Sequence, residues 1–238
     1  MAWRIEALVA FASVCGIVSG ADVRHGHVWK SGDGALVVDD SGLRWSEAKK
    51  PKHDRAWTWQ EIQQLELRPD SVRVLTYEDS RWKGGRDREY LLKPLAPGFA
   101  ESALAALRRG LGPKLVDALP SAATVTAVWE VPVKLHYRLG GSEGMLRFEG
   151  REVRYVSKEK GESRTWPLAG IELVSSDGPY DLALSTAERA GFARGPREFR
   201  FQLKTPLSRE NYQRLWSEIN QTHGLRPLAA TIRENESK

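Results

Sequence analysis

Cysteine is almost missing from this chain: Cys15 is the only one in 238 residues. A single thiol excludes any intramolecular disulfide, the device on which many small secreted domains depend. The composition is otherwise that of an ordinary globular protein, with 41% hydrophobic and 28% charged residues. Nine tryptophans supply large apolar side chains, so we expect the fold to be held by its hydrophobic cores alone.

Recognisable catalytic and cofactor motifs are also missing. No phosphate-binding loop or dinucleotide fingerprint is present. Residues 140–144, GGSEG, match the G-x-S-x-G pattern of hydrolases, but an alternating strand pattern follows where a hydrolase has a helix. We therefore expect a protein that is not an enzyme. An enzyme whose site one sequence does not reveal is the alternative.

Metal ligands are sparse. The five histidines are scattered, and His25 and His27 have no nearby cysteines or spaced carboxylates to complete a site of three or four ligands. We expect no metal and no cofactor.

A strong excess of charge of one sign is also missing, because 36 basic and 31 acidic residues are interspersed and leave a net charge of +5. This pattern does not indicate a nucleic-acid-binding protein, which concentrates basic charge on one face.

The N-terminal segment differs from the rest of the chain. Arg4 precedes an uncharged stretch, residues 7–21, that ends in small residues at Ser19 to Ala21. This order predicts a signal peptide over residues 1–21 and an extracytoplasmic protein, secreted or periplasmic. The alternative is a retained membrane anchor over residues 7–21, although this stretch is short for a bilayer span. Lipid attachment at Cys15 is disfavoured because Val14 stands where a small residue is expected.

The chain repeats itself. A shift of 110 residues places Gly34 on Gly144 and Trp45 on Tyr155. A shift of 109 residues then places the segment RAWTWQEI, which begins at Arg55, on RTWPLAGI, which begins at Arg164. The matches occur in order over some 65 residues, which predicts a duplicated unit.

Each copy has the same order of elements. In the second copy, the alternation in GMLRFEG, REVRYVS and REFRFQLK predicts strands, and Gly140 and Gly150 mark turns. Tyr212, Leu215, Trp216 and Ile219 then form the apolar stripe of a helix that follows Ser208 as its N-cap. In the first copy, the strand patterns end in a helix with Phe99, Ala103, Leu104 and Leu107 on its apolar stripe.

A run of antiparallel strands closed by one C-terminal helix resembles the pleckstrin-homology-like (PH-like) barrel family. The resemblance covers nearly all of residues 25–222. It implies a mainly β (α+β) protein of two duplicated antiparallel barrel or sandwich units, each closed by a helix, with the doubled tryptophan in the core. Another small β-barrel or sandwich with an added helix is the alternative fold. The expected divisions are a signal peptide at 1–21, domains at 22–112 (first copy) and 128–224 (second copy), a linker at 113–127, and a polar tail at 225–238.

Basic loops are the remaining candidate for binding. One loop precedes the first Trp segment, and the equivalent loop of the second copy is also basic. The candidate residues are Lys49, Lys50, Lys52, Arg55, Lys158, Lys160 and Arg164. Phosphoinositide-binding members of the PH-like family carry their basic residues mainly in the first hairpin. The first hairpins here lack that pattern, so no phosphoinositide site is carried over.

Two hypotheses follow. The first is a non-enzymatic, exported tandem module that binds a protein, a peptide or an envelope surface. The resemblance to PH-like barrels implies an open groove beside the closing helix, and exposed strand edges can add a peptide strand. The second is a membrane-tethered module whose basic loops make weak contact with anionic lipid or polymer, at about 1 kcal/mol for each basic residue near the surface. The oligomeric state is not indicated.

Overall fold

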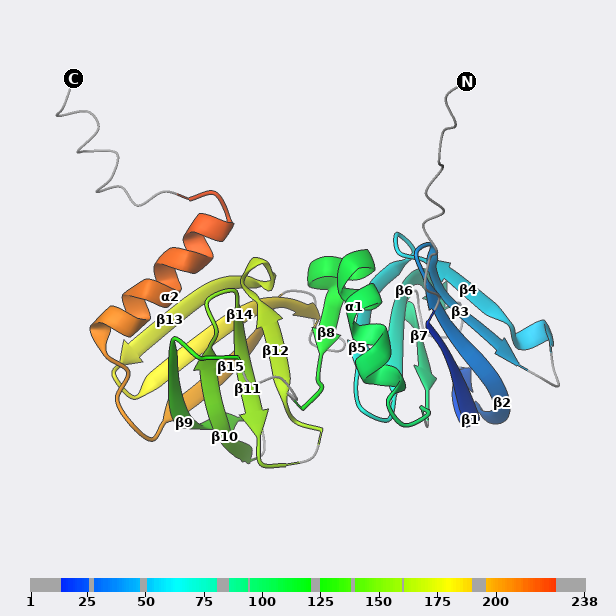
Figure 1. Cartoon of the computed structure of the whole chain (residues 1–238), viewed down its shortest axis with the longest axis horizontal. Coiled ribbons are helices and arrows are strands. Elements are labelled where there is room, and N and C mark those ends of the chain that lie inside the picture. The colour runs from blue at the N-terminus through cyan, green and yellow to red at the C-terminus, as the bar shows by residue number, and fades with distance from the viewer. Residues whose placement is uncertain are drawn as a thin grey trace, which may run out of the picture. The chain divides into compact units, whose positions relative to one another are not determined.

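The computed structural model describes residues 14–25, 28–47, 51–80, 86–93, 95–120, 125–137, 140–159, 161–189 and 196–225. Figure 1 shows the chain from its N-terminus in blue to its C-terminus in red. Strands make up 53% of it, and the described residues contain two α-helices. The protein is therefore mainly β, as the sequence predicts.

The first half of the chain contains seven strands, one helix and a short eighth strand. Their bounds are β1 Val14–His25, β2 Val28–Asp39, β3 Gly42–Glu47, β4 Arg55–Thr58, β5 Ile62–Leu67, β6 Val72–Ser80, β7 Arg86–Leu92, α1 Phe99–Leu111 and β8 Leu115–Asp117. Single 3₁₀ turns lie at Pro51–His53 and Gly112–Lys114.

The second half repeats the pattern of strands followed by a helix. Its elements are β9 Trp129–His136, β10 Gly141–Phe148, β11 Glu152–Ser157, β12 Arg164–Pro167, a 3₁₀ turn at Leu168–Gly170, β13 Ile171–Gly178, β14 Asp181–Arg189, β15 Pro196–Leu203 and α2 Arg209–Thr222.

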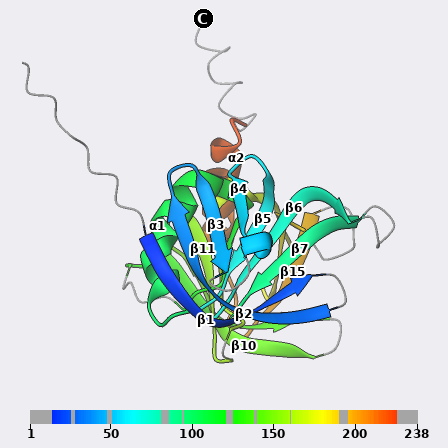
Figure 2. The same ribbon diagram turned by 90° about the vertical axis from the view of Figure 1, so that its right-hand side faces the viewer.

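The strands form two sheets. Four strands pair in the order β1-β2-β3-β4, which Figure 2 shows from the N-terminal side, and eleven in the order β13-β14-β15-β9-β10-β11-β12-β8-β5-β6-β7. The described strands close no barrel, which corrects the expectation of barrel units. Closure of the second copy would need β12 to pair with β13. Instead β12 pairs with β11 and β8, and β13 stands at the end of its sheet.

The chain divides into two compact units. Unit 1 comprises residues 1–63 and 70–112, and unit 2 comprises residues 64–69 and 113–238. Residues 64–69 belong to unit 2 because β5 pairs in parallel with β8, Leu65 opposite Leu115. The segment expected to be a linker, 113–127, therefore contains a strand. All three residues of β8 are buried.

The core of unit 2 forms where the apolar positions of its strands meet helix α2. Leu146, Phe148, Val153 and Tyr155 are fully buried, as their alternation in the sequence predicts. Helix α2 is capped by Ser208, the residue before it, whose hydroxyl accepts a hydrogen bond from the Asn211 amide at 3.2 Å. It buries Leu215 and Ile219 against the strands and leaves Trp216 41% exposed, although the sequence pattern places all three on one apolar stripe. Further buried members of this core are Trp129, Val131, Val133, Leu135, Trp166, Leu168, Ile171, Val174, Leu182, Leu184, Phe199, Phe201, Leu203 and Leu207.

Unit 1 has a core of the same kind. Trp45 and Tyr90 are its largest fully buried side chains, and α1 contributes Phe99, Ala103 and Leu107. Other buried apolar residues of this unit are Leu36, Val38, Leu43, Trp57, Ile62, Val72, Val74, Leu92, Leu95, Ala100 and Leu111.

The two copies pack a glycine against an aromatic ring at equivalent positions. In the first copy, a Cβ atom on Gly34 would lie 2.5 Å from the ring of Trp45. In the second, a Cβ atom on Gly144 would lie 2.7 Å from the ring of Tyr155. In both, the absence of a side chain on the glycine leaves room for the aromatic ring of the neighbouring strand to pack over it.

The doubled tryptophan is also packed in the same way in each copy. Trp57 contacts Tyr90 with ring centroids 4.9 Å apart, and Trp166 contacts Phe199 at 4.7 Å. Both tryptophans are 3% exposed. The prediction that they are core residues is confirmed.

Strand β1 lies across the end of the predicted signal peptide. Its residues 14–18 pair with residues 34–38 of β2, and a bulge separates this stretch from the pairs that begin at Ala21. Cleavage after Ala21 would therefore remove the part of β1 that pairs with residues 34–38. The signal peptide itself stays a prediction, and residues 1–13 lie outside the described part of the chain.

Candidate functional site

The predicted basic loops form no common site in the described part of the chain. Lys49, Lys50 and Lys160 lie outside the described residues. Lys52 is exposed, and Arg55 is half-buried with its guanidinium donating to the Asp54 carbonyl at 2.7 Å. Lys158 is exposed, and its ammonium lies 3.3 Å from the Glu143 carboxylate.

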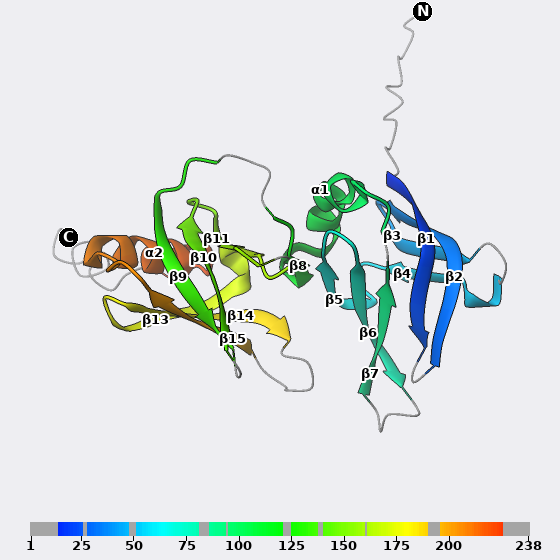
Figure 3. The ribbon, with the colours of Figure 1, turned by 90° about the horizontal axis from the view of Figure 1, so that it is seen from below.

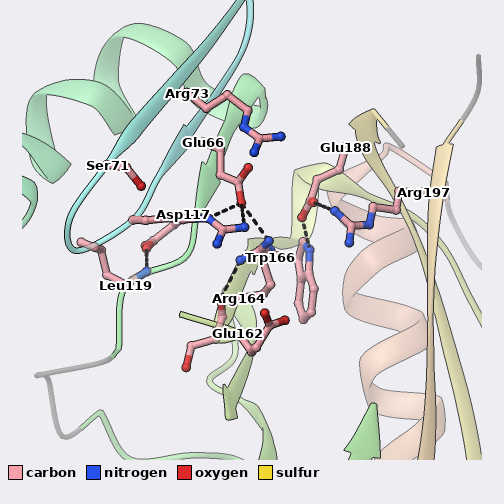
Figure 4. A network of polar contacts seen from close by, with 12 residues as sticks. Glu66, Ser71, Arg73, Asp117, Leu119, Glu162, Arg164, Trp166, Glu188 and Arg197 are labelled. Atoms are coloured by element: carbon pink, nitrogen blue, oxygen red, sulfur yellow. Dashed lines mark hydrogen bonds and ion pairs between the residues drawn. The ribbon is translucent and has the colours of Figure 1, made fainter. Parts of the chain in front are cut away.

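Arg164 lies inside unit 2 and not on a basic surface. It is 5% exposed, and its Nη2 donates to Glu66 Oε1 at 2.9 Å (Figure 4). Arg68 donates to the same oxygen from Nε at 3.0 Å. Two guanidinium groups thus share one buried carboxylate, which is how proteins accommodate charge away from water.

Glu188 is a second buried carboxylate of unit 2. Its Oε1 accepts a hydrogen bond from Trp166 Nε1 at 2.6 Å, and Arg197 Nη1 lies 3.5 Å from its other oxygen (Figure 4). Burial raises the pKa of Glu188 above its ordinary value of 4.5, and the nearby charges of Arg164 and Arg197 offset part of that rise. We interpret Glu188 as a structural residue, because the Trp166 indole bonds to one carboxylate oxygen and the Arg197 guanidinium lies beside the other.

Ser142, the serine of the hydrolase-like pattern, is fully buried on β10. Its Oγ lies 2.8 Å from the hydroxyl of Tyr155 and 3.1 Å from that of Tyr137, and Tyr137 in turn donates to Glu162 at 2.6 Å. Burial, with the hydrogen bond to Glu162, raises the pKa of Tyr137 to about 12. The phenols therefore stay neutral and hold Ser142 in a hydrogen-bonded cluster inside the unit.

Among the described residues, no group of three or more His, Cys, Asp or Glu side chains is placed to hold a metal ion. Within the same residues, neither helix is long and apolar enough to cross a bilayer.

The outer edge of β13 in unit 2 is the candidate binding surface. Within the described residues β13 pairs with β14 alone, and it stands at the end of the sheet order. Helix α2 lies beside it, as Figure 3 shows from below. Tyr212 donates to the Val174 carbonyl at 3.3 Å, and His223 Nε2 lies 2.9 Å from the Ile171 carbonyl.

Large apolar side chains are exposed on β13 and on the elements next to it. Leu173 on β13 is 55% exposed, and Trp216 on α2 is 41% exposed. Tyr180, in the turn after β13, and Leu225, just after α2, are also more than half exposed. Within the described residues, this part of unit 2 therefore combines a strand that has no partner strand on its outer side with exposed apolar side chains, and strand addition uses both backbone pairing and side-chain contacts.

The equivalent strand of the first copy already carries an added strand. A shift of 109 residues places Ile62 of β5 on Ile171 of β13. Strand β8 pairs with β5 in parallel, with Leu65, Glu66 and Leu67 opposite Leu115, Val116 and Asp117. Within the described residues, this edge carries a strand at β5 and carries none at β13.

The sequence pattern does not reveal this edge. Leu173 occurs in a segment that it placed in a strand, but periodicity does not tell which strand ends a sheet. The matched Trp segments could have pointed to it, because they align β13 with β5. The strand next to β5, β8, follows helix α1 in the chain.

Comparisons with known proteins add little. No protein-family model matches the chain, and no curated protein matches it. Among solved structures, it is similar to a chain of the Spt16D–Pob3N heterodimer at 13% identity, over 82% of this chain and 98% of that one, with a TM-score of 0.32. A TM-score this low carries no argument, so the architecture rests on the strands, pairings and packing described above.

Proposed function

We propose that this protein is a non-enzymatic tandem PH-like module that binds an extended peptide segment of a partner protein by strand addition to the edge of β13. The duplication is supported by the shared sequence register and by the matched glycine–aromatic and Trp–aromatic packing of the two copies. Export of the module, with residues 1–21 removed, is part of the proposal.

One observation carries the choice of site. The edge of β5 accepts β8 as a parallel strand, whereas the equivalent edge of β13 has no partner strand in the described residues. Unpaired strand edges are templates for another chain, and proteins that leave them open use them or protect them. An added strand here would gain backbone hydrogen bonds from β13 and apolar contact from Leu173 and Trp216.

The chemistry of the partner follows from the surface. Leu173 and Trp216 favour apolar side chains at alternate positions of the bound segment. The exposed carboxylates of Glu172 and Asp177 favour a segment with basic flanks. Nothing about this edge selects a lipid headgroup, and Lys158 and Arg164, two of the predicted basic residues, are already paired with carboxylates.

The test is selection of binders from a random twelve-residue peptide library on the full chain. Enriched peptides are expected to alternate apolar and polar residues, and Leu173→Asp should weaken their binding at least about tenfold, or about 1.4 kcal/mol. Val125→Asp is the matched control, because Val125 is also an exposed apolar residue and lies outside the strands. The proposal fails if no sequence is enriched, or if both variants bind the peptides as the parent chain does.

A further inference from the structure

A hollow of about 180 Å³ lies on the outer surface of unit 2, where strands β13, β14, β15 and β9 line it. Ser175 and Ser176 of β13 form the part of its wall nearest to the edge that we assign to the partner peptide. An engineered cavity of about 150 Å³ in another protein holds a benzene molecule, so this hollow has room for one side chain of a bound segment.

Short side chains lie between the strand edge and the hollow. Ser175 stands opposite Ala183 of β14, and Ala183 stands opposite Arg200 of β15. This row faces away from the core, because Val174 and Leu184 of the adjacent row are buried and successive residues of a strand point to opposite faces. Neighbouring strands are about 4.8 Å apart, so a long side chain on a strand added beside β13 would cross Ser175 and reach the hollow.

Carboxylates dominate the rim of the hollow. Asp177 lies near the end of β13, Asp181 begins β14, and both are exposed. Among the described residues, neither of these carboxylates has a hydrogen bond or an ion pair. Glu198, the third carboxylate, pairs with Arg200, and His136 lies on the far side. With His136 neutral, three carboxylates and one guanidinium leave a formal charge of −2, which attracts a cation.

The shape and the charge of the hollow together fit a basic side chain. Lysine and arginine lay an aliphatic stem on apolar surface and keep the charged head near water, and here the stem would lie on Ala183 with the head beside Asp177 and Asp181. An acidic or phosphorylated side chain would meet two unpaired carboxylates, and such like-charge contact selects against it. A purely apolar side chain would remove those carboxylates from water without a partner.

We propose that this hollow binds an arginine or lysine side chain of the partner peptide, at the peptide position that faces Ser175. The inference rests on the proposed function, since strand addition to β13 brings the peptide to the hollow. Leu173 and Ser175 are two residues apart on the same face, opposite Ser185 and Ala183. The bound segment should therefore carry an apolar residue beside Leu173 and a basic residue two positions away from it.

The peptide library selected on the full chain tests this pattern. Enriched peptides are expected to have Arg or Lys two positions from an apolar residue. The double variant Asp177→Asn, Asp181→Asn should weaken binding of such a peptide at least about tenfold, because it removes the charges that the basic side chain meets. The same peptide with norleucine in place of its basic residue should bind the parent chain and the double variant alike.

Glu172→Gln is the matched control for charge. Glu172 is also an exposed carboxylate of β13, but it does not line the hollow. Its removal should affect the basic peptide and the norleucine peptide equally. If Glu172→Gln weakens the basic peptide as selectively as the double variant does, the attraction belongs to the strand in general, and the inference is overturned.

A filled hollow tests the shape without changing any charge. Ala183→Leu should remove the preference for the basic peptide over the norleucine peptide. Ser185→Leu places the same side chain on the same face of β14, outside the hollow, and should keep that preference. Thermal unfolding shows whether both variants keep the fold. An unchanged preference in a folded Ala183→Leu chain overturns the inference.

A small probe separates failure of the inference from failure of the proposed function. N-acetyl-arginine amide is titrated into the full chain, and the amide chemical shifts of residues 175–183 are followed by NMR. Shifts that the double Asn variant loses, with no peptide enriched from the library, keep the hollow as a site for a basic side chain and reject the proposed function. Enriched peptides without the basic residue keep the proposed function and overturn the inference. No enriched peptide and no shift reject both.

Discussion

The buried carboxylate of Glu188 accepts a hydrogen bond from the indole of Trp166. At the matching place in the first half of the chain, the donor is the phenol of Tyr90. The counterpart of Glu188 by local structure is Glu78, since the amide of each donates to a threonine hydroxyl two residues earlier. Glu78 is exposed and accepts a hydrogen bond from the Tyr90 hydroxyl at 3.1 Å. The second copy has Phe199 in place of Tyr90, and the donor is Trp166 instead. One aromatic substitution thus accompanies a carboxylate moved from the surface into the core, with the raised pKa that burial causes.

This shift predicts a pH-dependent stability. Because the pKa of Glu188 is higher in the folded chain than its ordinary value of 4.5, the folded state holds the proton more tightly. The stabilisation is present in full below pH 4.5 and is lost as pH rises through the folded-state pKa. Glu188→Gln should flatten this fall, measured as the denaturant unfolding free energy at several pH values. Glu198→Gln, an exposed substitution on β15, is the control, and an equal fall in both variants would contradict the assignment.

At the scale of elements, the close approach of β10 to β11 depends on Gly144. A Cβ atom there would lie 2.2 Å from the Val156 carbonyl oxygen as well as close to the Tyr155 ring. This oxygen is a backbone atom of the paired strand, and it cannot move aside as the end of a flexible side chain could. The two strands would therefore have to separate.

Gly144→Ala is therefore expected to destabilise unit 2 by about 1–3 kcal/mol, the usual cost of overpacking a core. Gly178→Ala is the control, since Gly178 also lies in a strand and a Cβ atom there would meet nothing within 4 Å. Chemical denaturation followed by tryptophan fluorescence gives both values. Equal stability of the two variants would show that β10 and β11 can separate without cost.

At the scale of the whole molecule, the first strand, β1, overlaps the predicted signal peptide. The sequence predicts that residues 1–21 are removed on export, and the structure pairs residues 14–18 with β2. In the second copy, β9 pairs with β10 along its whole length, from Trp129 to His136. A chain that starts at Asp22 would have only the short remainder of β1 in the equivalent place.

Such a chain should therefore exchange the amides of residues 34–38 faster than the full chain, because residues 14–18 no longer pair with them. Hydrogen exchange on the two chains measures this, with residues 43–47 of β3 as the internal reference. Unchanged exchange at residues 34–38 would mean that the pairing with β1 adds nothing to unit 1. The intact mass of the exported protein shows independently whether residues 1–21 are removed.

Much of the fold was predictable from local pattern. Alternation placed Leu146, Phe148 and Tyr155 inside, and Ser208 began the helix as expected, since both signals depend only on near neighbours. Arg164 was not predictable as a buried residue, because its partner Glu66 is 98 positions away. The sequence predicted that a strand edge could bind a peptide. It did not predict which strand provides that edge, because the order of strands in a sheet is not written in local pattern.

The sequence by itself determined the mainly β composition, the core tryptophans and the two helices, because each follows from residue periodicity or from the matched Trp segments. Only the tertiary structure decided that β8 is a strand, that the sheets stay open between β12 and β13, and that β13 ends its sheet. Strand pairing joins residues far apart in the chain, and its energy comes from backbone groups that every residue carries alike. That β5 has a partner strand on this edge, and that β13 has none among the described strands, therefore follows only from the strand pairing.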